Sequence, residues 1–366
     1  SLSLSSELIA QSEISAPYEY LPATTNVETP QISGQAGTVS PSLLYDNTRP
    51  LQRIYFGAPG AGKSRQVAID TKEVNANVFR TTFHPDTDYA SFVGTYKPTL
   101  EVVDGKSSIT YASVPQLFAQ AYVQAWNNLS ELVCLIIEEI NRGNCAQIFG
   151  DLFQLLDRDS NTGFSKYPLI ADTDLARYLI DHIADTTAYT SKTGGLDQLM
   201  LPPNLLLYAT MNTSDQSLFP MDSAFKRRWD WQYIPIDYDD ARTIYIQIGD
   251  KRYNWGTFID VVNPLIYKLK GSEDKQLGNR FVDPPNNVVS ESQFRSKVLF
   301  YLWNEVWRDE HESGDTIFNE KIDAINSIQI KTYGELFWGT ADEQTARLQR
   351  FMAANGIEPV AHDDSV

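Results

Sequence analysis

The stretch Gly57-Ala58-Pro59-Gly60-Ala61-Gly62-Lys63-Ser64 decides the fold of this chain. It fits the pattern G-x-x-x-x-G-K-[ST], in which glycines let backbone N–H groups approach an anion without a Cβ in the way. An apolar run, Ile54 to Phe56, precedes it, and a helix-compatible segment, Ser64 to Lys72, follows. This context predicts a phosphate-binding loop, because the start of a helix adds unpaired N–H groups and the positive end of its dipole.

Two side chains at the end of this loop carry the chemistry that the motif implies. Lys63 would reach the β- and γ-phosphates of a nucleotide, and the Ser64 hydroxyl would ligate Mg²⁺. The alternative is a glycine-rich turn that binds nothing. The length of the motif and its correct flanks argue against that alternative. We therefore expect the whole stretch from Gly57 to Ser64 to bind nucleotide.

Composition bounds the classes of protein that need to be considered. The chain has 366 residues, of which 42% are hydrophobic and 12% aromatic, enough for a substantial core in one large domain or two smaller ones. Its formal net charge is −17. A field of that sign repels polyanions and disfavours broad, non-specific DNA binding by this chain.

The two cysteines and the absence of long apolar runs predict a cytoplasmic location. Cys134 and Cys145 have neither metal-ligand spacing nor the density of a disulfide scaffold, so we expect reduced, structural thiols. The sequence has no recognisable signal peptide and no apolar run long enough to span a bilayer.

Strand and helix patterns alternate from Arg53 onward and predict an α/β fold with a mostly parallel sheet and helices on both faces. Five apolar or β-rich runs are predicted as strands: 54–56, 78–83, 132–137, 205–210 and 229–236. Helices are expected at 115–127, 147–156 and 174–183. The predicted organisation is a flexible tail or linker (1–50), a core (51–237) with a polar insertion (158–203), a smaller, mainly helical domain (238–350) and a tail (351–366).

Two carboxylates follow the continuously apolar run at 132–137. Glu138 and Glu139 would therefore lie at the carboxyl edge of a parallel sheet, where open α/β sheets bind ligands. We expect Glu138 to hold Mg²⁺, through water, and Glu139 to polarise the attacking water. The alternative is that both acids merely end a strand in solvent. The nearby phosphate loop favours the functional interpretation.

A third apolar run ends in Thr210-Met211-Asn212-Thr213-Ser214-Asp215. Asn212 is placed to orient a water molecule against the γ-phosphate. An ordinary turn is the alternative, because Asn, Ser and Asp favour turns through local hydrogen bonds.

The segment Phe225-Lys226-Arg227-Arg228-Trp229 places three cations side by side in an acidic chain. An arginine supplied by a neighbouring subunit can stabilise the charge that develops during phosphoryl transfer. The alternative is a solvated basic turn that offsets Asp222 and Asp230.

Together these segments resemble the McrB-like branch of the AAA+ NTPases, the motor subunits of modification-dependent restriction systems. The resemblance covers about 53–235. It is carried by 57–64, 83–84 with 89–98, 137–142, 201–204, 211–217 and 224–229. The phosphate loop alone indicates only a P-loop NTPase, whereas the segments at 137–142 and 211–217 are far more specific.

The resemblance implies a five-stranded parallel core followed by a helical lid, assembled as a ring that is usually a hexamer, with nucleotide between subunits. By motif position, Arg142 and either Arg227 or Arg228 look like trans-acting or sensor arginines, and we assign Asp215 to nucleotide binding. The aromatic segment Tyr89 to Lys97 stands where AAA+ rings place loops facing the channel, although simple aromatic packing explains it equally well. Lys275 to Arg280 is a weak echo of the lid's nucleotide-facing segment.

Three positions depart from the family pattern. Gln216 replaces a usual arginine, Glu138 stands where Asp is usual, and Lys226 stands where a further arginine is often found. None of these changes removes the catalytic carboxylate or the lysine. No DNA-recognition domain is visible before Arg53, so we expect that such a domain was trimmed away or resides on another chain.

The leading hypothesis is an oligomeric, Mg²⁺-dependent nucleoside triphosphatase that powers an McrC-like partner nuclease and reaches DNA through that partner or through a missing domain. Nothing in the phosphate loop distinguishes GTP from ATP. Two alternatives stay open: an AAA+ chaperone that remodels protein complexes, and a nucleotide-gated scaffold with little turnover, at which Gln216 hints.

Overall fold

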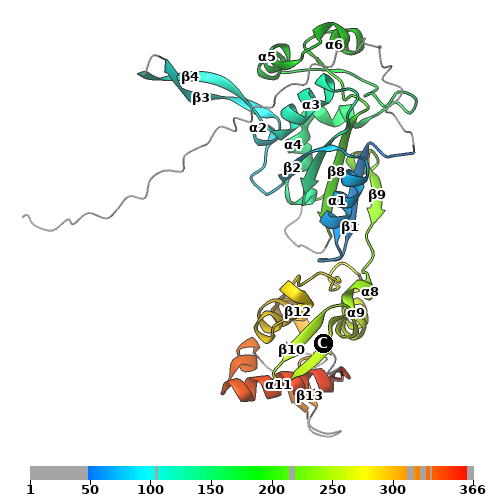
Figure 1. The fold of residues 1–366 in the computed structure, drawn as a ribbon, viewed down its shortest axis with the longest axis vertical. Coiled ribbons are helices and arrows are strands. Elements are labelled where there is room, and N and C mark those ends of the chain that lie inside the picture. Colours follow the sequence, from blue (N-terminus) through cyan, green and yellow to red (C-terminus); the bar gives the residue numbers. More distant parts are fainter. Residues whose placement is uncertain are drawn as a thin grey trace, which may run out of the picture. The chain divides into compact units, whose positions relative to one another are not determined.

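A five-stranded parallel sheet forms the centre of the first part of the chain (Figure 1). The computed structural model describes residues 48–103, 106–213, 219–310, 317–321, 327–329 and 332–360. The strand order is β2-β5-β8-β1-β9, and every neighbouring pair is parallel. The strands are β1 (Gln52–Gly57), β2 (Asn77–Thr82), β5 (Val133–Glu138), β8 (Leu205–Asn212) and β9 (Asp230–Tyr233). The predicted fold class and all five predicted strands are confirmed.

Both faces of the sheet are covered, which explains why its central strands read as unbroken apolar runs. Alternate residues of β5 enter different clusters of buried side chains: Leu135 and Ile137 join one, Cys134 and Ile136 the other. Helix α3 (Leu117–Asn127) contributes to the first cluster and α1 (Lys63–Glu73) to the second. A strand covered in this way has no polar face, so period-two alternation is absent from its sequence.

The register of the sheet brings the functional segments to one edge. Gly57 lies opposite Asn212 on β8, and Thr82 lies opposite Glu138 on β5. Because the strands are parallel, their carboxyl ends all point to this edge, where the phosphate loop also begins.

A long antiparallel hairpin was not predicted from the sequence. It consists of β3 (Gly94–Val103) and β4 (Lys106–Pro115), and Figure 1 shows it extending away from the five-stranded sheet. It follows the one-turn helix α2 (Tyr89–Phe92). Side chains such as Ile109 and Tyr111 are exposed on it. An exposed ribbon needs little apolar patterning, and so it leaves a weak signal in the sequence.

Aromatic packing accounts for the start of the segment Tyr89 to Lys97. Phe92 is only 2% exposed, and its ring lies 5.3 Å from that of Phe83 in an edge-to-face arrangement. The Tyr89 hydroxyl donates to Asp172 at 3.1 Å. Of the two explanations that the sequence left open, packing therefore holds for Tyr89 and Phe92.

The predicted insertion at 158–203 folds into short helices and strands that pack against the cluster of buried side chains containing α3. It contains α5 (Thr173–His182), close to the predicted helix, and a second helix that was not predicted, α6 (Thr186–Thr193). Strands β6 (Leu169–Ile170) and β7 (Gln198–Leu199) pair beside them. The hydroxyls of Tyr122 on α3 and Tyr189 on α6 lie 2.9 Å apart, and this buried contact fixes the insertion on the core. The predicted helix at 147–156 is realised as α4 (Cys145–Phe149) and a 3₁₀ helix (Gly150–Leu156).

The C-terminal part of the chain buries its own cluster of apolar side chains, from Ala241 to Ile357. Among the described residues its longest helices are α9 (Trp255–Lys270) and α11 (Ala341–Ala354). Short helices fill much of the rest: α8 (Tyr238–Ala241), α10 (Glu291–Gln293), π-helical turns (Phe294–Leu299, Leu302–Val306) and 3₁₀ turns (Pro285–Asn287, Arg308–Glu310, Tyr333–Phe337). The one-turn helix α7 (Ser223–Lys226) instead precedes β9 in the first part of the chain, where Phe225 joins the buried cluster.

The expectation that β structure stops near Asp240 is wrong. A three-stranded sheet of order β11-β10-β12 follows, together with the antiparallel pair β13–β14. These strands are β10 (Tyr245–Ile248), β11 (Lys251–Asn254), β12 (Val288–Val289), β13 (Asn319–Lys321) and β14 (Ser327–Gln329). Strands of two to four residues are too short for a periodic pattern to identify.

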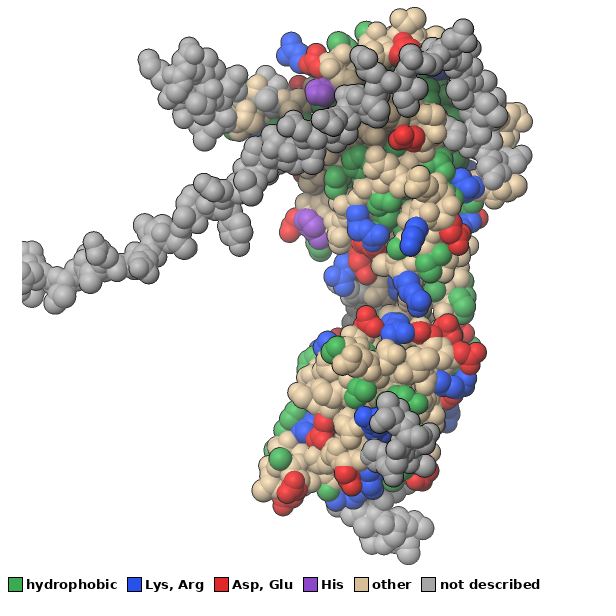
Figure 2. All heavy atoms as spheres, in the orientation of Figure 1, with side chains coloured by type: hydrophobic (Ala, Val, Ile, Leu, Met, Phe, Trp, Pro, Cys, Tyr) green, Lys and Arg blue, Asp and Glu red, His purple; other side chains and the backbone are tan. Residues whose placement is uncertain are grey.

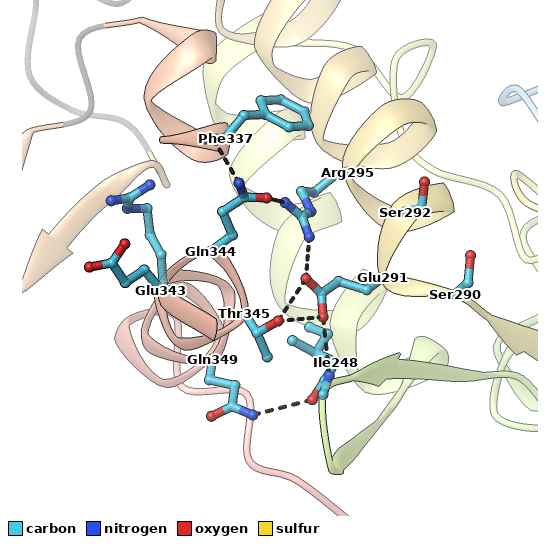
Figure 3. Close-up of polar contacts among 12 residues, drawn as sticks. Ile248, Ser290, Glu291, Ser292, Arg295, Phe337, Glu343, Gln344, Thr345 and Gln349 are labelled. Carbon is cyan, nitrogen blue, oxygen red and sulfur yellow. Dashed lines mark hydrogen bonds and ion pairs between the residues drawn. The ribbon is translucent and has the colours of Figure 1, made fainter. Parts of the chain in front are cut away.

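A partly buried carboxylate joins the last helix to this small sheet (Figure 3). The single Thr345 hydroxyl of α11 lies 3.0 Å from each carboxylate oxygen of Glu291 and shares its proton between them. The backbone N–H of Gly249, next to β10, donates to the same carboxylate at 3.1 Å. Arg295 forms an ion pair with the same carboxylate. Figure 3 shows these groups converging from three separate elements, so the network holds α11 in place.

Two sequence expectations and one surface feature concern the described chain as a whole. Cys134 and Cys145 are free and buried, as predicted. Within the described ranges, no helix combines the length and apolarity needed to cross a bilayer. Figure 2 shows Lys and Arg side chains interspersed with Asp and Glu on the face in view.

Candidate nucleotide-binding site

The phosphate loop joins the end of β1 to the start of α1, as its motif requires. Gly62 is the N-cap of α1 and has a left-handed backbone, with φ 94°. Gly60 has φ 75°, and a Cβ there would lie 2.4 Å from the backbone of Phe281. Residues with side chains rarely adopt these angles, so the two glycines set the course of the loop.

Lys63 lies at the first position of α1 and points back over the loop. Its ammonium group donates to the carbonyl oxygens of Gly57 at 3.1 Å and Ala58 at 3.0 Å. Burial lowers the pKa of Lys63, and the charges of Glu139 and Glu138 oppose that shift. The lysine and the two predicted carboxylates therefore lie within electrostatic reach of one another.

Ser64 and Glu138, the two predicted Mg²⁺ residues, are in direct contact. The Ser64 hydroxyl donates to Glu138 Oε2 at 3.0 Å. The Thr210 hydroxyl on β8 donates to the same oxygen. Three elements, α1, β5 and β8, thus converge on one carboxylate.

A cation that the sequence analysis did not single out completes this cluster. Arg80 on β2 forms an ion pair with Glu138 through Nη1 and Oε1. No motif marks Arg80. The only possible signal was its place two residues before the end of a strand that pairs with β5.

Glu139, the predicted base, has a left-handed backbone with φ 53°, unusual for a residue with a side chain. Its backbone N–H donates to the Thr210 hydroxyl at 3.1 Å. Its carboxylate Oε2 lies 3.8 Å from Nε of Arg142. The structure therefore brings two of the predicted catalytic residues, Glu139 and Arg142, together within one chain.

Asn212 stands at the end of β8, beside the first glycine of the phosphate loop. Its carbonyl oxygen accepts a 2.7 Å hydrogen bond from the side chain of Asn141, and the Asn141 carbonyl accepts one of 2.9 Å from Phe219 N–H. The buried Asn141 was quoted in a motif but given no role. It joins the segment after β5 to the end of β8. The predicted nucleotide-binding residue Asp215, and Gln216 beside it, lie outside the described residues.

The two candidate arginines that follow α7 (Ser223–Lys226) have different surroundings in the structure. Arg228 forms an ion pair with Asp157 at 2.6 Å, its side chain is 9% exposed, and its guanidinium lies 3.9 Å above the ring of Phe153. Arg227 is exposed. Arg228 is thus fixed within its own chain, while Arg227 faces solvent.

The segment Lys275 to Arg280, the weak echo of a lid motif, contacts the phosphate loop. The backbone N–H groups of Gly278 and Arg280 donate to the carbonyls of Pro59 and Gly60, each at 2.9 Å. A Cβ on Gly278 would lie 2.2 Å from the carbonyl carbon of Gly60. Arg280 in turn binds both carboxylate oxygens of Asp240, at 2.6 and 2.7 Å.

The oxygen donors at this edge suit Mg²⁺, a hard cation. Among the described residues no group of three or more His, Cys, Asp or Glu side chains forms a self-sufficient metal site. A serine hydroxyl beside one carboxylate fits a metal that takes its other ligands from phosphates and water.

These features define a P-loop NTPase of the AAA type: a phosphate loop at the edge of a parallel sheet, with acidic and amide side chains at the ends of neighbouring strands. Comparison with known proteins agrees, because residues 54–229 match the AAA domain family (dynein-related subfamily).

Two relatives identify the branch of AAA proteins to which the chain belongs. It is 34% identical over 318 residues to component YdiS of the type II restriction enzyme BsuMI from Bacillus subtilis (strain 168), covering 78% of this chain and 84% of the relative. It is 27% identical over 192 residues to the EcoKMcrB subunit of a type IV methyl-directed restriction enzyme from Escherichia coli (strain K12). That match covers 51% of this chain and 36% of the subunit. The chain belongs to the McrB-like AAA+ NTPases.

Proposed function

We propose that this protein hydrolyses ATP or GTP in a Mg²⁺-dependent reaction and powers a partner nuclease in a DNA restriction or defence system. The observation that carries the proposal is the convergence of Lys63, Ser64, Glu138 and Glu139 at one sheet edge, with contacts from α1 to β5. Nothing else in the described part of the chain gathers a phosphate loop and paired carboxylates in this way.

Each residue has a role that follows from its position. Lys63 and the N–H groups of the phosphate loop would bind the phosphates. Glu139 would accept a proton from the attacking water, and Asn212 would orient that water. Ser64 and Glu138 would hold Mg²⁺, which neutralises phosphate charge when bound.

The proposed active form is a ring, with nucleotide between subunits. Arg227 is the better candidate for an arginine that acts on a neighbour's nucleotide, because it is exposed. Arg228 is held by Asp157 and Phe153 within its own chain, and we propose that its main role is structural.

The proposed partner is an McrC-like nuclease subunit. Both relatives are named as parts of restriction enzymes, which supports this class of partner. The net charge of −17 favours contact with DNA through another chain or domain rather than through this chain at large.

One of the two alternatives loses part of its support. Gripping a peptide through Tyr89 and Phe92 requires exposed rings, but both side chains are packed within the fold. The scaffold hypothesis depends on Gln216, which lies outside the described residues.

The direct test is phosphate release from ATP and from GTP by the purified protein, with and without the candidate nuclease. We expect turnover of at least one nucleotide and loss of turnover in Glu139→Gln. Calorimetry that detects no binding of either Mg-nucleotide to the wild type would overturn the proposal.

A further inference from the structure

Arg80 is a cation fixed on the carboxylate that is expected to serve the metal. It lies on β2, the edge strand, where Arg80 pairs with Ile136 and Thr82 pairs with Glu138. This register lets the long side chain of Arg80 run toward the end of β5 and reach Glu138 Oε1. The Glu138 side chain is 15% exposed and that of Arg80 is 42% exposed, so the pair lies at the rim of the site.

The remaining oxygen of Glu138 is also engaged. Oε2 accepts from the hydroxyls of Ser64 and Thr210. An ionised carboxylate has about four lone-pair positions. Three donors from three different elements therefore hold Glu138, and only one of those donors, Arg80, carries a charge.

The charge of Arg80 has a consequence that the hydroxyls lack. A divalent cation at Glu138 would share the carboxylate with the Arg80 guanidinium. Two positive charges on one carboxylate lie close together and repel. Among the described residues, the charged groups that interact at this edge are Lys63, Arg80 and Arg142 on one side and Glu138 and Glu139 on the other. These five groups by themselves thus offer a metal no excess of negative charge. A bound triphosphate would supply that excess.

We propose that Arg80 makes metal binding depend on the nucleotide, by offsetting the charge of Glu138 so that the divalent cation enters with the triphosphate rather than before it. This inference rests on the proposed function. Arg80 is a positioning residue in this account, because it acts through Glu138.

A purely structural role for Arg80 predicts the opposite change in metal affinity when Arg80 is removed. If Arg80 served only to orient Glu138, its loss would loosen the carboxylate and weaken metal binding. Thr210→Val provides the comparison, because it removes a hydrogen bond from Glu138, and the acceptor of the Glu139 N–H, without changing the charge. The electrostatic account predicts tighter binding in Arg80→Gln and weaker binding in Thr210→Val.

The experiment measures Mn²⁺ bound to the full chain by electron paramagnetic resonance, with and without a slowly hydrolysed ATP or GTP analogue. The variants are Arg80→Gln, Arg80→Met, Arg80→Lys and Thr210→Val. Arg177→Gln is the matched control, because it removes the same charge from an exposed position on α5. Thermal melting verifies that each variant folds, and Arg80→Met replaces Arg80→Gln if the latter does not.

Without nucleotide, we expect Arg80→Gln to bind Mn²⁺ about tenfold more tightly than the wild type, as expected for removing one nearby charge. Arg80→Lys and Arg177→Gln should match the wild type. The analogue should enhance Mn²⁺ binding less in Arg80→Gln than in the wild type.

Unchanged or weaker Mn²⁺ binding in both neutral variants would overturn the inference while leaving the proposed function intact. Failure of the wild type to bind Mn²⁺ even with either analogue would instead count against the proposed function itself.

Discussion

At the scale of single residues, the site is built around Glu138. The family resemblance marked this glutamate as a departure, one methylene longer than the usual aspartate. In the structure its carboxylate is held by Ser64, Thr210 and Arg80, each from a different element. The longer side chain is thus matched by donors on three sides, which a reading of motifs one at a time does not reveal.

Nucleotide binding and turnover should separate between Lys63 and Glu139. We expect Lys63→Ala to lose nucleotide binding, because the partly buried ammonium is the proposed phosphate ligand of the loop. Glu139→Gln should bind Mg-nucleotide normally but hydrolyse it at least about 100-fold more slowly, the range typical for loss of a general base. Equilibrium binding of a fluorescent nucleotide and phosphate release measure the two effects. Normal turnover in Glu139→Gln would assign the base elsewhere.

Arg227 and Arg228 should differ in what their loss affects. Arg228→Ala leaves Asp157 without its guanidinium partner, so we expect a loss of about 1.5–3 kcal/mol in the free energy of unfolding. Arg227→Ala removes an exposed side chain and should leave stability unchanged while lowering turnover. Urea unfolding and phosphate release distinguish the two variants. An unstable Arg227→Ala beside a stable Arg228→Ala would reverse the assignment.

At the scale of elements, the predicted strands were found because each has a strong local pattern. β5 and β8 are continuously buried up to their last residues, and each ends in a polar residue of the candidate site. The β3–β4 hairpin and the short strands β10 to β12 lack such a pattern and were missed. Their pairing depends on partners that lie elsewhere in the chain or on a turn, rather than on apolar periodicity.

The contact between the phosphate loop and the segment Lys275 to Arg280 should affect nucleotide affinity. Gly278→Ala places a methyl group 2.2 Å from the Gly60 carbonyl carbon, so the two segments must separate and lose the hydrogen bonds from Gly278 and Arg280. We expect nucleotide affinity to fall about tenfold, equivalent to one net hydrogen bond. Gly334→Ala is the control, because a methyl group there meets only the Thr332 hydroxyl, at 3.9 Å. Equal nucleotide affinity in both variants would show that this contact does not shape the loop.

The two thiols should report on the integrity of β5 and α4. Burial raises the pKa of Cys134, and it raises that of Cys145 to about 12. Because the thiolate is the reactive form, both residues should resist iodoacetamide at pH 8 in the native protein and react readily in urea. Mass spectrometry counts the modified thiols. Rapid labelling of the native protein at either residue would mean that this region opens easily.

At the scale of the whole molecule, the proposed ring makes a prediction about mixtures. We expect Lys63→Ala to lose nucleotide binding but retain Arg227, and Arg227→Ala to bind nucleotide but not assist a neighbour. Each variant should be inactive alone. An equal mixture should recover roughly a quarter of the wild-type rate. In a randomly mixed symmetric ring, about a quarter of the interfaces pair a subunit with intact Lys63 and a neighbour with intact Arg227. No recovery, despite mixed assembly verified by mass photometry, would contradict catalysis across the interface.

The sequence by itself determined that this chain is a P-loop NTPase of the AAA type. The phosphate loop, the carboxylates of Glu138 and Glu139, and the strands that carry them are all local patterns, readable without knowledge of distant neighbours. Only the tertiary structure decided which side chains meet. Arg80 reaches Glu138 across 58 residues of chain, and Arg228 reaches Asp157 across 71. Such pairs depend on strand order, register and packing, which bring together segments whose sequences carry no mark of each other.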